Sequence, residues 1–117
     1  MGSSPTKADE LRFERLQEIG CIACYLDGSP GEPGDIHHLV DKGYRKHSGG
    51  HRATLCLCQW HHSGKPRMGF SKKWMAEKYG PSLAENKKAF VAHYGTEREL
   101  LVKSDALIRA PAVAQAG

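Results

Sequence analysis

The chain has 117 residues, 39% of them hydrophobic, and a mean hydropathy of −0.55. This length suffices for one domain with a modest core, and no apolar run approaches the roughly 20 residues needed to cross a bilayer. No N-terminal segment has the pattern of a secretory signal. The net charge of +4 is mildly basic and does not by itself select a partner. We therefore expect a single cytoplasmic domain over residues 1–117 with no membrane partner.

The first expected element is a helix over residues 6–19. Thr6 can cap its N-terminus, with Asp9 at the third helical position, and Gly20 can end it. The next residues, Cys21–Cys24, are expected to form a tight knuckle that places two thiols close together.

Two short strands are expected in the middle of the chain, over residues 35–40 and 53–57. They can pair as a hairpin, because the polar, glycine-containing stretch at 42–50 is suited to a long loop. A short helix should begin within residues 58–62, and it cannot continue undisturbed past Pro66.

The C-terminal half is expected to be helical. Ser71 can cap a helix that ends at Gly80. Ser82–Glu85 and Thr96–Glu99 each have the capping-box pattern, and each follows shortly after a glycine, so they are expected to open two further helices. The alanine-rich end, residues 110–117, is expected to be a flexible tail.

Four cysteines in a chain without a secretory signal are more often metal ligands than disulfides. Cys21 and Cys24 are separated by two residues, and so are Cys58 and His61. Two such pairs can supply the four N and S ligands of a tetrahedral zinc site, which would stabilise a chain with a small core. Cys56 can replace Cys58 in this set, but the spacing to His61 favours Cys58 and leaves Cys56 as a small core residue.

Two histidine doublets lie near this zinc set. His37 and His38 are neighbours on an expected strand, so their side chains point to opposite faces and suit different tasks. His38 can act as the base that activates water, since an imidazole titrates near neutral pH. His37 and His62 can hold a divalent ion that neutralises charge on a phosphate. His51 lies between the doublets and is a further catalytic candidate.

Basic residues gather in two stretches that flank these histidines. Such patches attract a phosphate backbone without reading its sequence, although solvated helix faces have a similar composition. The candidate DNA-binding residues are Lys42, Arg45, Lys46, Arg52, Lys65, Arg67, Lys72 and Lys73.

These motifs, in this order, resemble the HNH nucleases of the ββα-metal class. More narrowly, they resemble the phage and prophage Ref family of recombination-enhancement, RecA-dependent nucleases. The segment from Tyr94 to Leu101 is also similar to that family's C-terminal part, and the resemblance extends from Thr6 to Ile108. The stretches that carry it are Cys21-Ile-Ala-Cys24, Asp35-Ile-His37-His38-Leu39, His51 and Leu55-Cys56-Leu57-Cys58-Gln59-Trp60-His61-His62.

The resemblance implies an α+β fold with a small zinc-stapled ββα-metal (HNH) core. It implies a DNA endonuclease that hydrolyses phosphodiester bonds with Mg²⁺ or another divalent cation, on DNA bound by a RecA filament in a bacterial host cell. It assigns His38 as the general base, and His37 and His62 as catalytic metal ligands. The alternative is a non-catalytic zinc-stapled DNA-binding module. The single expected domain has an N-terminal helix (6–19), a zinc-stapled ββα core (21–66), a helical half (71–109) and a tail (110–117).

Two departures from the HNH pattern affect the catalytic assignment. No Asn occurs between His38 and His62, so His51 or Thr54 must take the role of the usual middle-motif Asn. Pro66 occupies a position where many HNH proteins have another histidine. The catalytic metal is therefore expected to have two protein side chains, with water and DNA phosphate completing its coordination, which suits Mg²⁺.

Overall fold

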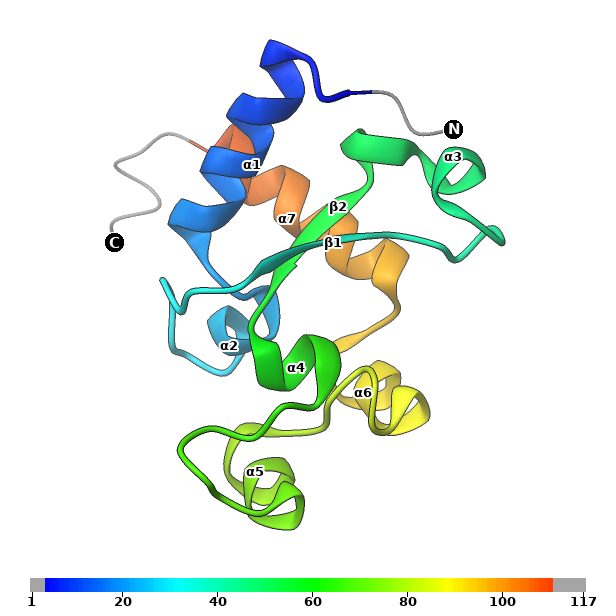
Figure 1. Cartoon of the computed structure of the whole chain (residues 1–117). Coiled ribbons are helices and arrows are strands. Elements are labelled where there is room, and N and C mark those ends of the chain that lie inside the picture. Colours follow the sequence, from blue (N-terminus) through cyan, green and yellow to red (C-terminus); the bar gives the residue numbers. More distant parts are fainter. Residues whose placement is uncertain (1–3, 111–117) are drawn as a thin grey trace.

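A computed structural model describes residues 4–110 of the chain. It has a central two-stranded sheet, formed by β1 (Asp35–His38) and β2 (Thr54–Leu57), with helices packed against it (Figure 1). This arrangement confirms the predicted α+β class. The helices are α1 (Lys7–Ile19), α2 (Ile22–Leu26), α3 (Arg45–Ser48), α4 (Gln59–Ser63), α5 (Lys72–Tyr79), α6 (Lys87–Tyr94) and α7 (Glu97–Arg109), with one 3-10 helix, η1 (Gly50–Arg52).

Helix α1 begins and ends where the sequence predicts. The Asp9 N–H donates to the Thr6 hydroxyl and the Thr6 N–H donates to the Asp9 carboxylate, which completes a capping box. At the other end Gly20 has a φ of +83°, and its N–H donates to the Leu16 carbonyl. This turn directs the chain into α2, which begins just after Cys21.

The hairpin is antiparallel, and its register pairs Asp35 with Leu57 and His38 with Thr54. Every residue of β2 is buried, because α1, α2 and α7 pack against it. Strand β1 is more exposed, and its histidine side chains stay partly accessible. The sheet therefore presents the candidate site residues His37 and His38 on β1 and core residues on β2.

The segment predicted as a loop, residues 42–50, contains α3 and the start of η1. Within it, the Ser48 hydroxyl accepts a hydrogen bond from the Lys42 N–H and lies buried at the base of the segment. Gly49, with a φ of +117°, ends α3. Both strands are shorter than predicted at the end near this segment, since β1 ends at His38 and β2 begins at Thr54.

The predicted capping box at Ser82–Glu85 is wrong. Helix α6 begins later, with the Asn86 side chain accepting from the Ala89 N–H. Ser82 and Asn86 close a single turn through their backbones, and the Ser82 hydroxyl has no hydrogen-bond partner among the described residues. The Glu85 carboxylate pairs with Lys72 at 3.1 Å instead of reaching back to the backbone. A tertiary ion pair and a competing asparagine cap therefore override the local pattern.

The second predicted capping box, at Thr96 and Glu99, is confirmed at the start of α7. Leu100 and Leu101 from this helix enter the core beside Trp60 and the other largest buried side chains. None of the helices within residues 4–110 has the length and apolar character needed to cross a membrane. Most of the predicted tail, from residue 111 onward, lies outside the described residues.

A substitution at Gly20 tests how much the close packing of the turn before Cys21 contributes to stability. A Cβ at Gly20 would lie 2.6 Å from the backbone N of Glu32, and the φ of +83° with ψ of −169° disfavours any other residue. We expect Gly20→Ala to destabilise the fold by at least about 1–3 kcal/mol, measured by thermal unfolding. Gly28→Ala is the matched control, because Gly28 also has a positive φ but has open space around it. Equal losses in the two variants would contradict this account.

Candidate functional site

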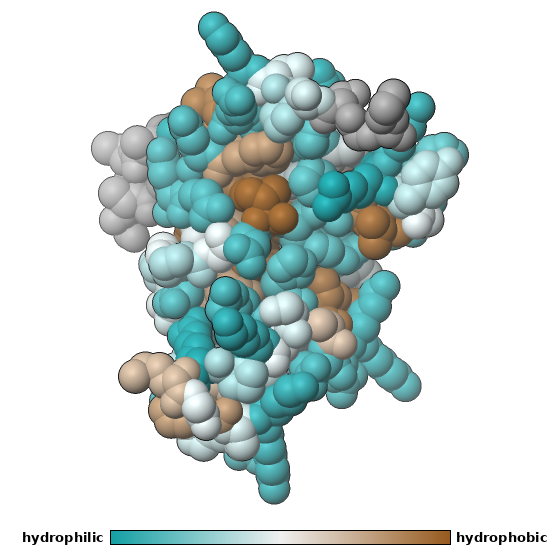
Figure 2. Space-filling view, in the orientation of Figure 1, coloured by the Kyte–Doolittle hydropathy of each residue, from teal (hydrophilic) through white to brown (hydrophobic). Residues whose placement is uncertain are grey.

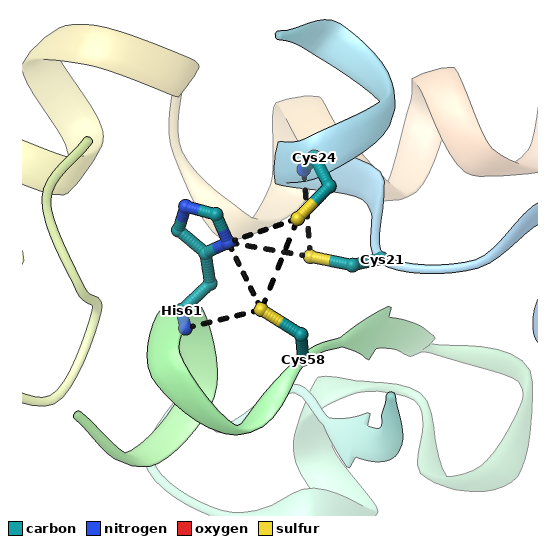
Figure 3. Close-up of side chains that lie close together, drawn as sticks. All are labelled: Cys21, Cys24, Cys58 and His61. Carbon is teal, nitrogen blue, oxygen red and sulfur yellow. Dashed lines mark hydrogen bonds between the residues drawn. The ribbon is translucent and has the colours of Figure 1, made fainter. Parts of the chain in front are cut away.

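Three cysteines and one histidine meet in the interior, between α2 and α4 (Figure 3). The Nδ1 of His61 lies 3.5 Å from the Sγ of Cys21, 3.5 Å from that of Cys24 and 3.2 Å from that of Cys58. The sulfurs of Cys24 and Cys58 are 3.9 Å apart. All four side chains are buried. The two sequence pairs predicted to form one site are therefore brought together.

These separations fit a zinc ion. A tetrahedral site with Zn–S bonds of about 2.3 Å has ligand atoms roughly 3.5–3.8 Å apart, close to the distances found here. The sulfurs of Cys21 and Cys58 also accept backbone N–H groups, from Cys24 and His61 respectively, each at 3.5 Å. Such bonds stabilise thiolates, which are the form of cysteine that binds zinc. The cluster therefore suits a structural metal.

The cluster is supported from outside by the C-terminal half. The Nε2–H of His61 donates to the Tyr79 carbonyl at 2.7 Å, which leaves Nδ1 free to act as a metal ligand. Arg67 donates to the sulfurs of Cys58 and Cys24 at 3.7 and 3.9 Å and also pairs with Glu32. The sequence predicts that Arg67 contacts DNA; in the structure its guanidinium is engaged by partners within the chain.

The position of Cys56 resolves the alternative that the sequence leaves open. Its side chain is buried outside the cluster, with its Sγ 4.0 Å from the Gln17 side chain. Burial raises the pKa of Cys56 to about 12, so it remains a thiol at neutral pH. Hydrogen bonds from Cys21 and Cys24 lower the pKa of Cys58 instead. Cys58 is therefore the residue equipped to be a thiolate ligand.

A second group of side chains joins β1, α4 and α7. The Nδ1 of His37 lies 3.2 Å from the Nε2 of His62, and the Nε2–H of His37 donates to the Glu97 carboxylate at 2.8 Å. The other nitrogen of His62 lies 4.0 Å from the carboxylate of Asp35. Burial, followed by the nearby His37, lowers the pKa of His62 and favours its neutral form. One nitrogen of each imidazole thus faces the other imidazole, and its second nitrogen faces a carboxylate.

Glu97 is the member of this group that the sequence does not predict. It is 7% exposed at the first position of α7, and 60 residues separate it from His37 in the sequence. In the sequence it is an acidic residue in the first turn of a helix, which is a common placement that needs no further function. Its burial against a candidate metal ligand became apparent only in the folded chain.

His38 points to the opposite face of β1, toward η1 and α1. Its Nε2 shares a hydrogen bond of 2.9 Å with the Nδ1 of His51, and both rings lie edge-on to Phe13. Burial, and next the charge of Arg45, lower the pKa of His38, so it is neutral at pH 7. Its Nδ1 has no hydrogen-bond partner among the described residues. Of the two candidates for the middle-motif position, His51 shares a hydrogen bond with the His38 ring, and the Thr54 hydroxyl donates to the His51 carbonyl at 2.9 Å.

The predicted DNA-binding residues form two separate groups in the fold. One group is exposed on and around α3 and η1, on the same side of the sheet as His38. The other lies on and before α5, at the opposite end of the molecule (Figure 1). In chain order the groups are Lys42, Arg45, Lys46 and Arg52, and then Lys65, Arg67, Lys72 and Lys73.

The fold and its buried cluster define a small α+β protein with a Cys3His group that could hold a metal ion. Comparison with known families is more specific. The chain belongs to the recombination enhancement, RecA-dependent nuclease family, whose model matches residues 5–109. This match confirms the family-level resemblance and covers both histidine groups as well as the cluster.

Separate substitutions of Cys56 and Cys58 test which of the two is a metal ligand and which is a core residue. Cys58→Ser is expected to lose bound zinc and to lower the melting temperature, because it removes one of four ligands. Cys56→Ser, the matched control, is expected to keep one zinc per chain. Metal analysis of the purified proteins, with thermal unfolding, checks both. Retention of zinc in Cys58→Ser together with its loss in Cys56→Ser would contradict the assignment.

Proposed function

We propose that this protein is a metal-dependent DNA endonuclease of the HNH, ββα-metal class. The observation that carries the proposal is the division of β1 into two faces. His37 meets His62 and Glu97 on one face, and His38 meets His51 on the other. The hairpin followed by α4 supplies the strand, strand and helix order of such a core. Membership of a nuclease family supports the same reaction.

The facing nitrogens of His37 and His62 suit a divalent cation. Two ligands at about 2.1 Å on neighbouring corners of an octahedron lie roughly 3 Å apart, and the two nitrogens are 3.2 Å apart. With only two protein ligands, water and a DNA phosphate would complete the coordination, which suits Mg²⁺. When bound, the cation would neutralise charge on the phosphate and on the leaving oxygen.

Glu97 would orient His37 toward that cation. A carboxylate accepts hydrogen bonds and does not donate them, so the proton of the neutral His37 ring stays on Nε2 and the lone pair on Nδ1 points at His62. Helix α7 also favours a negative charge at its N-terminus, where Glu97 lies. The C-terminal half would thereby hold a ligand that belongs to the central hairpin.

His38 would take a proton from the attacking water. When its Nε2–H donates to His51, the lone pair is on Nδ1, the nitrogen that lacks a partner within residues 4–110. That atom is covered in this structure, so a rotation of the ring or its neighbours must admit the water. His51 would hold the ring in place, which is the task usually given to the missing Asn.

The basic residues would hold the DNA backbone. Arg45 lies near enough to His38 to influence its pKa, which places a guanidinium beside the proposed base. Because the family is RecA-dependent, we propose that the substrate is DNA coated by a RecA filament, in phage or prophage recombination. The DNA and RecA contacts are proposals that the family name supports.

A non-catalytic DNA-binding module is the second candidate. The covered Nδ1 of His38 favours it, and so does the lack of an Asn between His38 and His62. This alternative predicts DNA binding that weakens steeply with salt, and no cleavage with any divalent cation. Cleavage of DNA by the purified chain would therefore exclude it.

Replacement of the proposed base tests the reaction. His38→Ala is expected to reduce nicking of supercoiled plasmid by about 10²- to 10⁴-fold, the usual contribution of a general base. The assay uses Mg²⁺, with and without RecA, ATP and a guiding single strand. His47→Ala is the matched control, because His47 is exposed on α3 and contacts the Tyr44 hydroxyl. Full activity in a folded His38→Ala protein would rule out this assignment.

Removal of the Glu97 charge tests the proposed metal site without relying on activity. Glu97→Gln is expected to weaken Mn²⁺ binding by roughly 10- to 100-fold, as is typical when a partner of a ligating histidine is changed. Glu99→Gln is the matched control, because it removes the same charge from the same helix turn but does not contact His37. Electron paramagnetic resonance of free Mn²⁺ gives both affinities, and equal weakening in the two variants would argue against the role of Glu97.

A further inference from the structure

The loop before α5 and the first turn of this helix expose three large apolar side chains. Met68 is 94% exposed, Phe70 42% and Trp74 38%. The rings of Phe70 and Trp74 are stacked, with centroids 4.0 Å apart and planes inclined by 22°. Figure 2 shows the corresponding apolar patch at the lower left, bordered by hydrophilic side chains. Neither the zinc cluster nor the proposed catalytic groups use these rings.

The stacked pair is held in place by the structure beneath it. The backbone N–H of Trp74 donates to the Ser71 hydroxyl, and the backbone N–H of Phe70 donates to the Arg67 carbonyl. The Arg67 guanidinium lies 4.4 Å from the centre of the Tyr79 ring, and this ring meets Trp74 edge-on at 6.0 Å. Since Arg67 also donates to the cluster sulfurs, the zinc site and the aromatic pair share one support.

The backbone that presents the patch is strained. Met68 has a φ of +46°, and it is the one residue other than glycine with a positive φ among residues 4–110. Such a conformation is uncommon for a side chain of this size, and strain of this kind is often found at functional surfaces. Here it turns the loop so that Met68 faces solvent instead of joining the core.

The charges around the patch are mainly positive. Lys65, Lys73 and Lys78 are exposed, and no salt bridge of theirs occurs within the described part of the chain. Lys72 pairs with Glu85, and Glu77 is the acidic residue of α5. An apolar partner would not need these lysines, whereas a nucleic-acid backbone would be attracted by them.

We propose that Phe70 and Trp74 form a stacking site for an unpaired base of single-stranded DNA, with the neighbouring lysines holding its phosphates. Aromatic side chains beside a positive surface are the usual means of binding single strands without sequence preference. Bases within a duplex are already stacked on one another, so they cannot use the site. The proposal rests on DNA being the substrate, and it identifies a single-stranded segment as the part that this end of the molecule binds.

Binding of a fluorescently labelled single-stranded oligonucleotide, measured by anisotropy without added divalent metal, tests the site. Phe70→Ala and Phe70→Leu are each expected to weaken binding by roughly 5- to 100-fold, while affinity for a duplex of the same sequence changes little. The leucine variant keeps an apolar surface but has no ring to stack. Val102→Ala, at an exposed position on α7, is the matched control and should bind normally. Zinc content and thermal unfolding confirm that each variant is folded.

Trp74 fluorescence provides a second measurement of single-strand binding, in the unmodified chain. The other tryptophan, Trp60, is 1% exposed, so quenching by the oligonucleotide reports on Trp74. Strong quenching by single strands and weak quenching by duplex is expected. Unchanged fluorescence, with Phe70→Leu binding as well as the unmodified chain, would overturn the proposal and favour an apolar protein segment as occupant. Because these measurements need no cleavage, they separate this site from the proposed nuclease chemistry.

Discussion

Two segments that are distant in the sequence meet at the Cys3His cluster, and the position of α4 depends on that meeting. The knuckle at Cys21 and Cys24 supplies two ligands, and the start of α4 supplies Cys58 and His61. Successive residues of a helix point about 100° apart, so a helix whose His61 faces inward presents His62 to another side. There His62 meets His37 on β1. The buried cluster thus sets the geometry of a site to which it contributes no atom.

The alternation of side chains along β1 gives the neighbouring His37 and His38 separate surroundings. Glu97 from the last helix contacts one, and His51 from the segment between the strands contacts the other. The His37 group needs α4 and α7 as well as the hairpin, whereas His38 and His51 both lie within the hairpin and its connecting segment. The family match over residues 5–109 includes α7 together with the hairpin. A change at Glu97 is expected to alter the His37 group while leaving the Cys3His cluster, which has no residue on α7, in place.

Features encoded by local chemistry could be predicted from the sequence. The capping boxes at Thr6 and Thr96 depend on residues three apart and were confirmed, and the two Cys/His pairs with the same spacing do meet in one buried cluster. The predicted capping box at Ser82 is absent, and Glu85 instead pairs with Lys72, which only the tertiary structure brings near. Glu97 was missed for the same reason, since its contact with His37 requires the packing of α7 against the sheet. Long-range contacts of this kind leave no periodic signal in a single sequence.

We propose that the chain binds two metals at two different sites, one for structure and one for reaction. Anomalous diffraction from crystals containing Zn²⁺ and Mn²⁺, recorded at the absorption edge of each metal, tests it directly. The account predicts a zinc peak among Cys21, Cys24, Cys58 and His61, and a manganese peak within bonding distance of His37 Nδ1 and His62 Nε2. A zinc peak elsewhere, or manganese bound away from these histidines, would contradict it.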